Sequence, residues 1–545
     1  MGSGAMTNSM DDISQHAEAF FIIGSNTSEQ HPVFGTMLRR AVRFRGAKLI
    51  VADPRRIDIV DFATLHLRHR GGTDIALVNG LMHIILKNGW ENKDFIANRT
   101  ENFDEFHETV MRYTPEKTEE ITGVPQAKLH EAAEIMANAK PMAVMWAMGI
   151  TQHITGVHNV FSLANLQMLL GNMGVPGGGV NPLRGQNNVQ GACDLGGLPN
   201  VYSGYQKVAD EAVQKKFEQA WGVPLNPTVG KAATEMVPGI LEGKTSALYV
   251  MAENPVMSEP DTHHVRKSFE QLDFMVLQEI FPSETSAYAD VLLPGVSFAE
   301  KDGCYTNTER RIQKVNAAIP PQGDSRPDWQ IISELGKRMM AKRVVDVDAA
   351  YSGWDYRSPA EVMTEVAALT PIYGGVSHAR LEAGERLQWP CTGPEHPGTP
   401  ILHVGKFARG LGKFHAVDHV PPAEQPDDDY PFVMSTGRVL YHWHGGEMTR
   451  RTNGLSKVYG DAMIELNPED AIKLGANDES YINVTSRRGT IQAQAWVTQR
   501  VPPGMVYANF HFPEASANIL TQAALDPIAK IPEYKVTAVK VEKAT

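Results

Sequence analysis

Cysteine is scarce in this chain, and long apolar runs and basic clusters are absent. Its three cysteines, Cys193, Cys304 and Cys391, lie about a hundred residues apart, which supports neither a disulfide framework nor a CxxC metal or cluster site. Reduced, intracellular thiols fit this spacing best. No stretch approaches the roughly 20 apolar residues that cross a bilayer, so we expect no membrane span. Residues 1–7 lack the basic start and apolar run of a secretory signal, which favours a cytoplasmic protein.

The charge balance argues against a nucleic-acid-binding protein. The net charge is −12 and the sequence contains no basic tract, although local arginine clusters could still bind phosphate. With 545 residues, of which 42% are hydrophobic and 21% charged, the chain can bury sizeable cores in several domains. We therefore expect a multidomain globular protein that does not bind nucleic acid.

The first recognisable unit has the order strand, loop, helix, strand. Phe20–Ile23 predicts a buried strand, the polar loop 24–32 follows it, and residues 33–45 have helical spacing that ends at Gly46. A second strand, 48–52, ends at Asp53, where dinucleotide-binding folds hold a ribose. The loop lacks a GxGxxG fingerprint, so the pattern predicts a nucleotide but not ordinary NAD.

The same order recurs later in the chain. Residues 247–251 predict a strand, 252–255 a loop, the stretch up to Leu272 a helix, and 274–279 a second strand. Each copy is followed by a short segment that ends in an apolar run, at 62–67 and at 289–294. Loops at the carboxyl ends of two such units predict two nucleotide-like ligands, or one long ligand between them. The alternative is Rossmann-like packing without a ligand.

The C-terminal part has a different pattern of predicted secondary structure. The proline-rich, acidic segment 420–429 indicates a linker, after which 432–435, 481–486 and 491–497 predict short strands and 467–470 opens a helix. This pattern predicts a small β-barrel. Residues 436–438, 441–445 and 509–512 form a second ligand-like surface, in which His442 and His444 could bind a metal, although two histidines alone are weak evidence.

Further polar and glycine-rich clusters allow two interpretations each. In 70–74, Thr73 or Asp74 is either an N-cap or a ligand contact, and 146–152 is either a tight turn or a surface for a heterocycle. Residues 303–311 could clamp phosphate. His153, His158 and His264 fit surface or core positions better than metal ligation.

The most informative segment is 179–194. It combines glycines with Asn181, Gln186, Asn187, Asn188 and Gln190, and it contains a single arginine, Arg184. Amides offer many hydrogen bonds, and a guanidinium grips a carboxylate or phosphate, so the segment predicts a binding site rather than an exposed polar loop.

Several blocks resemble the catalytic (alpha) subunit of formate dehydrogenases, in the molybdopterin oxidoreductase (DMSO reductase) family. They are VNPLRGQNNVQGACDLGGLP, VADPRR, MAENP, DWQIISELGKRM and PEYKVTAVKVE, and the resemblance spans essentially the whole chain. It implies an α/β fold with two Rossmann-like dinucleotide-binding units and a C-terminal β-barrel. The implied domains are a first α/β molybdopterin-binding domain at 1–186, with its start missing, a second at 187–425, and a barrel molybdopterin dinucleotide-binding domain at 426–545.

The resemblance also implies a cofactor and its contacts. A molybdenum or tungsten ion would be held by two pyranopterin guanine dinucleotides (bis-MGD), and Arg184 would be the catalytic, substrate-binding arginine. One dinucleotide would use the 24–29 loop and 53–55, the other 252–255 and 278–279, while barrel residues close the site. The implied cofactor-binding residues are Gly24, Ser25, Asn26, Glu29, Asp53, Pro54, Arg55, Gly72, Asp74, Gly149, Gln152, Gln186, Ala252, Glu253, Asn254, Gln278, Glu279, Thr285, Arg438, His442, His444, Asn518, Tyr534 and Lys535.

The sequence departs from the family pattern at its start. The family's cysteine or selenocysteine metal ligand precedes the stretch that resembles GSGAMTNS, and the residues that bind a 4Fe–4S cluster lie further upstream. No metal ligand is therefore expected in this chain, and Cys193 matches a different family cysteine. The chain resembles the C-terminal two-thirds of such a subunit.

The implied reaction is the oxidation of formate to carbon dioxide, with electrons passing through iron–sulfur partners to flavin and NAD subunits. Three alternatives stay open: a noncatalytic molybdopterin-binding fragment or assembly partner, which the missing ligand segment favours; a nicotinamide-binding dehydrogenase, which the missing GxGxxG disfavours; and a related molybdoenzyme acting on another oxyanion. The sequence does not decide between molybdenum and tungsten, nor the electron acceptor or the oligomeric state.

Overall fold

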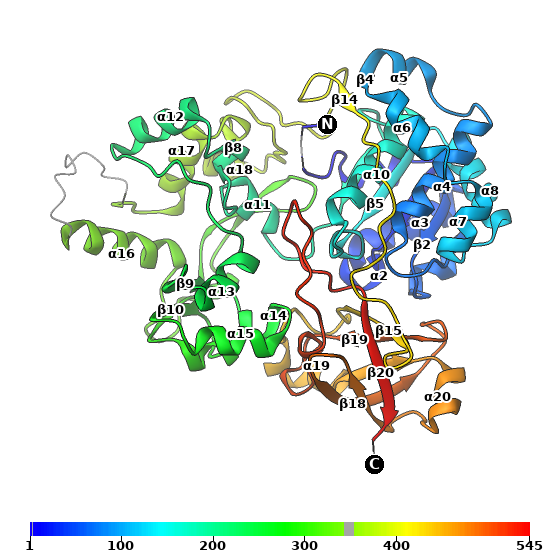
Figure 1. The fold of residues 1–545 in the computed structure, drawn as a ribbon. Helices are drawn as coiled ribbons and strands as arrows, with labels where there is room; N and C mark the ends of the chain where they lie inside the picture. Colours follow the sequence, from blue (N-terminus) through cyan, green and yellow to red (C-terminus); the bar gives the residue numbers. More distant parts are fainter. Residues whose placement is uncertain (3, 343–353, 545) are drawn as a thin grey trace. The chain divides into compact units, whose positions relative to one another are not determined.

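The computed structural model describes residues 1–2, 4–342 and 354–544, which fall into two compact units (Figure 1). Unit 1 comprises Met1–Gly185, Pro255–Arg266 and Ile401–Thr545, and unit 2 comprises Gln186–Asn254 and Lys267–Pro400. Each unit is described by itself below.

Unit 1 contains a five-stranded parallel sheet with the order β3-β2-β1-β5-β6. Every residue of the central strand is buried, because helices cover both faces of the sheet, as its continuous apolar run predicts. Phe21 and Ile23 pack on the side of α4, α8 and α10, whereas Phe20 and Ile22 pack on the side of α3. The strands are β1 (Ala19–Ile23), β2 (Lys48–Ala52), β3 (Leu65–Leu67), β5 (Met142–Trp146) and β6 (Val180–Pro182).

Ten α-helices accompany this sheet in the described part of residues 1–185. They are α1 (Met10–His16), α2 (Thr27–Gln30), α3 (Pro32–Arg45), α4 (Asp74–Lys87), α5 (Lys93–Arg99), α6 (Phe103–Val110), α7 (Pro115–Thr122), α8 (Gln126–Asn138), α9 (Met148–Thr151) and α10 (Gly156–Leu170). The chain returns to this region after residue 401, where β14 (Gly412–Lys413) pairs with β4 (Thr100–Glu101). The predicted linker 420–429 lies in an irregular stretch that leads to the barrel.

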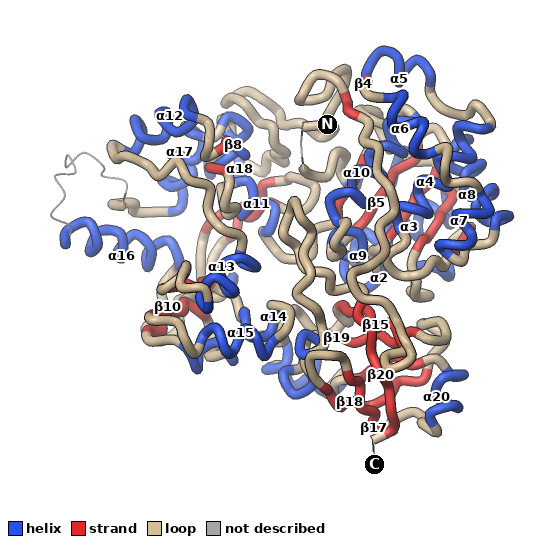
Figure 2. Tube along the Cα trace, in the orientation of Figure 1, coloured by secondary structure: helices blue, strands red, loops and turns tan. Residues whose placement is uncertain are grey.

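A closed barrel completes unit 1, as predicted, with the strand order β15-β19-β16-β18-β17-β20 (Figure 2). Inward side chains such as Ile464, Val484, Val506 and Val539 form its core. The strands are β15 (Phe432–Gly437), β16 (Met463–Leu466), β17 (Tyr481–Thr485), β18 (Thr490–Val497), β19 (Met505–Asn509) and β20 (Thr537–Lys543), with α19 (Asn453–Val458) and α20 (Pro468–Leu474) between them. Asn467 caps α20 through its side chain.

Unit 2 contains a three-stranded parallel sheet, β11-β10-β9. Its strands are β9 (Ala247–Met251), β10 (Phe274–Glu279) and β11 (Val291–Pro294). Its other elements are α11 (Val189–Asp194), β7 (Val201–Tyr202), β8 (Gln206–Lys207), α12 (Glu211–Trp221), α13 (Ala233–Leu241), the hairpin β12 (Gly303–Thr306) and β13 (Ile312–Val315), α16 (Asp328–Lys342), α17 (Pro359–Leu369) and α18 (His378–Glu382).

The helix predicted after residue 255 is wrong in its extent. The chain forms two short helices instead, α14 (Pro255–Ser258) and α15 (Thr262–Phe269). Pro260 lacks a backbone donor, and Asp261 has φ +52°, so a continuous helix cannot pass through them.

The internal repeat extends to strand register. Ile23 lies opposite Ala52 on the neighbouring strand, and Met251 lies opposite Gln278 in the same way. The third strand of each repeat, β3 or β11, pairs in the same register. Ala52 lies opposite Leu67 and Gln278 opposite Leu293, and the two pairs have the same separation in sequence. The predicted repeat therefore places 24 and 252, and 53 and 279, at equivalent ends of the two sheets.

Candidate functional site

The loop after β1 lies at the carboxyl end of the larger sheet. Strands β2 and β3 extend to one side of β1, and β5 and β6 to the other, so the strand order reverses here, where α/β sheets bind ligands. The loop touches the one after β5 closely: a Cβ on Gly149 would lie 2.5 Å from the carbonyl oxygen of Gly24. Side chains are excluded from this contact, which leaves backbone exposed to a ligand.

The same loop holds polar atoms that the protein does not satisfy. The hydroxyls of Ser25 and Thr27 and both amide atoms of Asn26 are buried and make no hydrogen bond within the described residues. Each such atom costs about 1–3 kcal/mol when it has no partner. Donors and acceptors gathered in this way fit a large polar ligand such as a dinucleotide.

Glu29 and Arg55, both expected to bind cofactor, join the α/β part of unit 1 to its barrel. Arg55 donates to both carboxylate oxygens of Glu465 at 3.0 and 2.5 Å, and its guanidinium lies 3.4 Å from the ring centre of Tyr507. Glu29 accepts from Arg500 at 2.6 Å. Burial alone would lower the pKa of Arg55, but Glu465 and Tyr507 hold it above its ordinary value.

Their neighbours Asp53 and Pro54 shape the turn after β2. Asp53 accepts from the backbone N–H of Arg55 at 2.8 Å, and burial raises the pKa of its carboxyl. The carbonyl of Pro54 accepts from Arg68 at 3.0 Å. The Asp53 carboxylate therefore keeps acceptor capacity at the carboxyl end of β2.

In the 70–74 cluster, the N-cap interpretation is wrong, whereas a ligand contact stays a prediction. Neither Thr73 nor Asp74 caps α4 through its side chain; Thr73 donates to the Arg70 carbonyl at 2.7 Å. Asp74 is buried and lies 3.0 Å from His69 Nε2. A Cβ on Gly72 would lie 2.4 Å from Pro422, so this glycine permits close packing. Gln152 is half-buried and ends α9.

In unit 2, the predicted residues lie at and after the carboxyl ends of β9 and β10, and several of their side chains bind neighbours within the chain. Asn254 accepts from the Thr285 hydroxyl at 2.7 Å and donates to Glu284 at 2.8 Å. Gln278 donates to Asp328 at 2.7 Å and accepts from Tyr249. Glu279 accepts from the backbone of Ile280, and Ala252 and Glu253 are exposed. This loop therefore has a fixed shape in the chain itself, unlike its counterpart after β1.

In the barrel, Arg438 reaches the end of the 179–185 segment and contacts His444. A Cβ on Gly185 would lie 2.1 Å from an Arg438 guanidinium nitrogen, so the guanidinium packs directly against this glycine. Arg438 donates to His444 Nε2 at 3.5 Å and lies over the ring of Trp443. Burial and the charge of Arg438 lower the pKa of His444 to about 4.

His442 does not form a metal-binding pair with His444. Its Nε2 contacts the Tyr459 carbonyl at 2.6 Å and its Nδ1 the Thr449 hydroxyl at 3.2 Å, so both ring nitrogens have protein partners. Nowhere in residues 1–2, 4–342 and 354–544 do three or more His, Cys, Asp or Glu side chains gather in a way that could hold a metal.

The remaining predicted residues of the barrel domain donate hydrogen bonds to backbone carbonyls of nearby segments. Asn518 donates to the Met257 carbonyl at 2.7 Å, and Tyr534 to the Ser258 carbonyl at 2.8 Å, which fixes α14 on the barrel within unit 1. Lys535 donates to the Thr436 carbonyl at 2.7 Å. Burial, together with the charge of Arg438, lowers the pKa of Lys535 to about 7.

Arg184 is anchored through its backbone and its side chain. Its guanidinium donates to the Gly4 carbonyl at 3.0 Å, and its own carbonyl lies 2.7 Å from His31 Nε2. Gln186, the first residue of unit 2, is exposed. Sequence reasoning missed His31; its only signal was its place at the end of the polar loop, before Pro32.

Two of the amides that follow Arg184, Asn188 and Gln190, bind other groups of unit 2. Asn188 accepts from the backbone of Thr306 at 2.9 Å, and Gln190 donates to Asp194 at 2.8 Å. Tyr205 and Tyr373 also donate to Asp194, each at 2.7 Å. These contacts build a buried network within unit 2.

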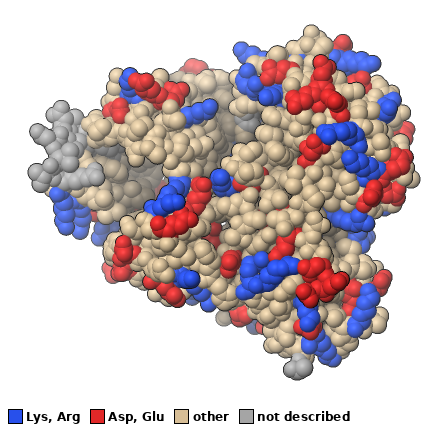
Figure 3. All heavy atoms as spheres, viewed as in Figure 1, with Lys and Arg blue, Asp and Glu red and all other residues tan. Residues whose placement is uncertain are grey.

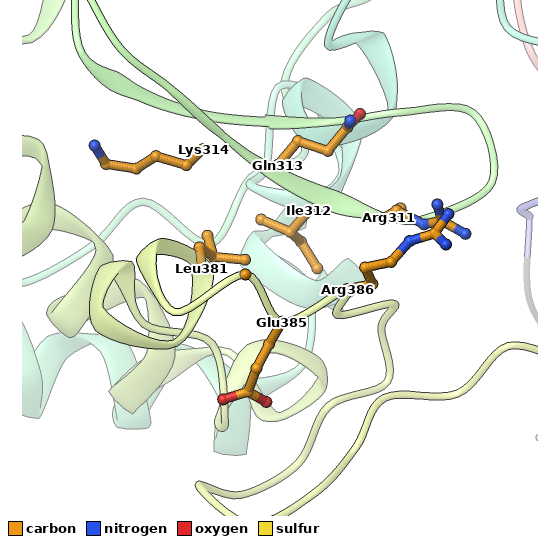
Figure 4. Close-up of a pocket in the computed structure, with 8 residues that line it drawn as sticks. Arg311, Ile312, Gln313, Lys314, Leu381, Glu385 and Arg386 are labelled. Carbon is orange, nitrogen blue, oxygen red and sulfur yellow. The ribbon is translucent and has the colours of Figure 1, made fainter.

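The phosphate clamp predicted in 303–311 is wrong for its buried arginine. Arg310 donates to the carbonyls of Trp389, Thr399 and Pro400, the last two at 2.8 and 3.0 Å. Arg311 instead lines a cavity of about 360 Å³ in unit 2 (Figure 4), and none of the cofactor-binding residues implied by the family resemblance lines it. Its lining residues are Arg311, Ile312, Gln313, Lys314, Leu381, Gly384, Glu385 and Arg386.

Figure 3 shows acidic and basic side chains interspersed over the visible face, without a field of one sign. None of the described helices combines the length and the apolar composition that a bilayer crossing needs.

Comparisons with known proteins identify relatives along the whole chain. The molybdopterin oxidoreductase family model matches residues 2–338, and that of the molydopterin dinucleotide binding domain matches 432–538. The F420-dependent formate dehydrogenase 1 subunit alpha of Methanococcus maripaludis is 44% identical over 544 residues, which cover 99% of this chain and 78% of the relative. Formate dehydrogenase H of Escherichia coli is 38% identical over 548 residues, covering 99% and 75%.

A solved structure supports the fold. Acetylene hydratase from Pelobacter acetylenicus superposes with a TM-score of 0.77 and 19% identity, covering 99% of this chain and 79% of that one. At this identity the likeness concerns the fold alone. The predicted α/β fold with a C-terminal barrel is thereby confirmed.

Proposed function

This chain belongs to the molybdopterin oxidoreductase family, and from that premise we propose that it oxidises formate to carbon dioxide at a molybdenum or tungsten bis-pyranopterin guanine dinucleotide centre. The observation that carries the proposal is the full-length similarity to proteins named formate dehydrogenase, which includes the segment around Arg184. The unsatisfied polar atoms of Ser25, Asn26 and Thr27 support binding of a dinucleotide at the first loop.

We propose that the two equivalent sheet ends each hold one dinucleotide. The first would use Gly24–Thr27 and the Asp53 carboxylate, and the second Ala252–Asn254 with Gln278 and Glu279. Glu29 and Arg55 would act by holding the barrel in place rather than by touching the ligand. We propose the domains 1–186, 187–425 and 426–545; the chain passes from unit 1 to unit 2 after Gly185, whereas residues 255–266 and 401–425 belong to unit 1.

When bound, the metal and its pterins supply the redox centre that takes up the two electrons lost by formate. The chain's own contribution is to bind and orient the substrate. The Arg184 guanidinium would pair with the formate carboxylate through charge-assisted hydrogen bonds and direct the C–H bond toward the metal centre. Arg438, held against Gly185, adds a second positive charge beside it.

The electron acceptor is a further part of the proposal. We propose that iron–sulfur partners carry the electrons to flavin and NAD subunits. The names of several relatives specify F420 dependence, so F420 is the competing acceptor. Anaerobic assays of the assembled enzyme with each acceptor would separate the two.

The substitution Arg184→Ala tests the proposed reaction. In the enzyme loaded with cofactor it should abolish formate oxidation, because the carboxylate loses its partner, while metal and guanine nucleotide content stay near those of the unsubstituted enzyme. Formate-dependent dye reduction and cofactor analysis on the same sample measure both quantities. Unchanged turnover would overturn the assignment, and a lost cofactor would reassign Arg184 to cofactor binding.

A further inference from the structure

His31 lies at a rigid junction in unit 1. It ends α2 and begins α3, its N–H donates to the Thr27 carbonyl at 3.2 Å, and its carbonyl accepts from Gly35 at 2.8 Å. Pro32 follows and fixes the next φ angle. A Cβ on Gly35 would lie 2.9 Å from the Thr27 carbonyl oxygen, so the two helices pack too closely to shift. The imidazole therefore projects from a fixed backbone.

The ring reaches across to the segment that carries Arg184. Its Nε2 lies 2.7 Å from the Arg184 carbonyl oxygen, which can only accept a hydrogen bond. The proton therefore resides on Nε2. Burial lowers the pKa of His31, with a further contribution from the charge of Arg438, so the ring is neutral near pH 7 and Nδ1 is a bare acceptor. This Nδ1 is buried and has no partner among the described residues.

The neighbouring residue, Gln30, makes a similar contact with the backbone of the second arginine, Arg438. Its side chain donates to the carbonyl of Arg438 over a long 3.4 Å contact. The Arg438 guanidinium in turn packs against Gly185, next to Arg184. Two adjacent residues of one helix end thus contact the backbones of both arginines, which come from the end of β6 and from the barrel.

We propose that His31 is a positioning residue: by donating to the carbonyl of Arg184 it sets the place of that guanidinium relative to Arg438, so that the two face one carboxylate. This inference rests on the proposed function. It assigns His31 no contact with the reacting atoms. Its effect should appear in substrate binding more than in the chemical step, because a displaced Arg184 weakens its grip on the carboxylate.

Two substitutions of similar size distinguish a positioning role of His31 from a role in packing alone. In His31→Gln the amide nitrogen can occupy the place of Nε2 and still donate to Arg184. In His31→Asn the shorter amide can reach only the place of Nδ1, and the hydrogen bond is lost. In the cofactor-loaded enzyme we expect His31→Asn to raise the KM for formate about tenfold, the effect of one lost buried hydrogen bond, with a smaller change in kcat. His31→Gln should stay within about threefold.

A second measurement does not depend on activity. Hydrogen exchange of the chain without cofactor should show faster exchange of amides 184–187 in His31→Asn than in His31→Gln, with the amides of β19 unchanged as a control for folding. Equal KM values and equal exchange in the two variants would overturn the inference. Should His31→Asn fail to fold, a rise in KM above threefold in His31→Gln would overturn it.

The two proposals fail in different ways. If Arg184→Ala leaves formate oxidation intact, the proposed function fails, whatever His31 does. If Arg184→Ala abolishes oxidation while both His31 variants behave like the unsubstituted enzyme, only the positioning role fails.

Discussion

At the scale of single residues, the two repeats place different residue types in the same left-handed backbone conformation. The residue after the first strand has φ +57° at Gly24 and φ +53° at Ala252, and each donates its N–H to the end of the neighbouring strand. Glycine adopts this conformation freely, whereas alanine is strained in it. The first repeat needs glycine for a second reason, since a Cβ there would lie 2.8 Å from the backbone of Gly149.

Exchanging these residues should therefore change stability in opposite directions. Ala252→Gly should stabilise the chain by about 0.5 kcal/mol, because relief of strain exceeds the added entropy of the unfolded chain. Gly24→Ala should destabilise it by about 2 kcal/mol or more, through backbone overlap. Thermal unfolding of both variants measures the difference. A stabilising Gly24→Ala would show that the loops after β1 and β5 are not in contact.

At the scale of elements, one buried ion pair joins the turn after β2 to strand β16. Arg55 and Glu465 are each almost fully buried, and Arg500 extends the contact to Glu29. Removing one member of a buried pair leaves the other charge without compensation, which costs about 3–5 kcal/mol. The pair therefore fixes the barrel to the α/β part of unit 1.

Glu465→Gln should accordingly lower the stability of unit 1 by several kcal/mol, about 3 as a central value. Glu469→Gln is the matched control, because Glu469 is exposed on the nearby helix α20 and should change stability by less than about 0.5 kcal/mol. Urea unfolding followed by the fluorescence of barrel tryptophans such as Trp496 measures both. Equal effects would mean that the Arg55 charge is compensated by Arg500's partner, Glu29.

At the scale of the whole molecule, the two units differ in how well their sheets are covered. Every residue of β1 is buried, whereas Tyr249, Phe274 and Leu292 in the sheet of unit 2 are 39, 45 and 53% exposed. Less buried apolar area means less hydrophobic stabilisation. In the chain without cofactor we expect calorimetry to resolve two transitions, with unit 2 unfolding first, and amides of β10 to exchange faster than those of β1. A single transition with equal protection of β1 and β10 would contradict this.

Much of the architecture followed from the sequence because it depends on local pattern. Continuous apolar runs marked β2, β9 and β10 at their observed bounds, and the repeat and the barrel followed from the order of such segments. The block around Arg184 indicated the family through its resemblance to the formate dehydrogenase motif, whereas its amides and glycines by themselves predicted only a binding site. The helix after residue 255 was predicted too long, because a proline and one left-handed residue decide its break.

The sequence by itself determined the fold class and the family and indicated the segments in which we propose the site, because periodicity and motif spacing are properties of neighbouring residues. Only the tertiary structure decided which polar groups remain available. It paired Arg55 with a glutamate 410 positions away and placed Arg310 among carbonyls. It also left the amide of Asn26 without a protein partner and brought His31 to Arg184, 153 positions away. Partners so distant in sequence leave no local signal, and only the tertiary packing brings them together.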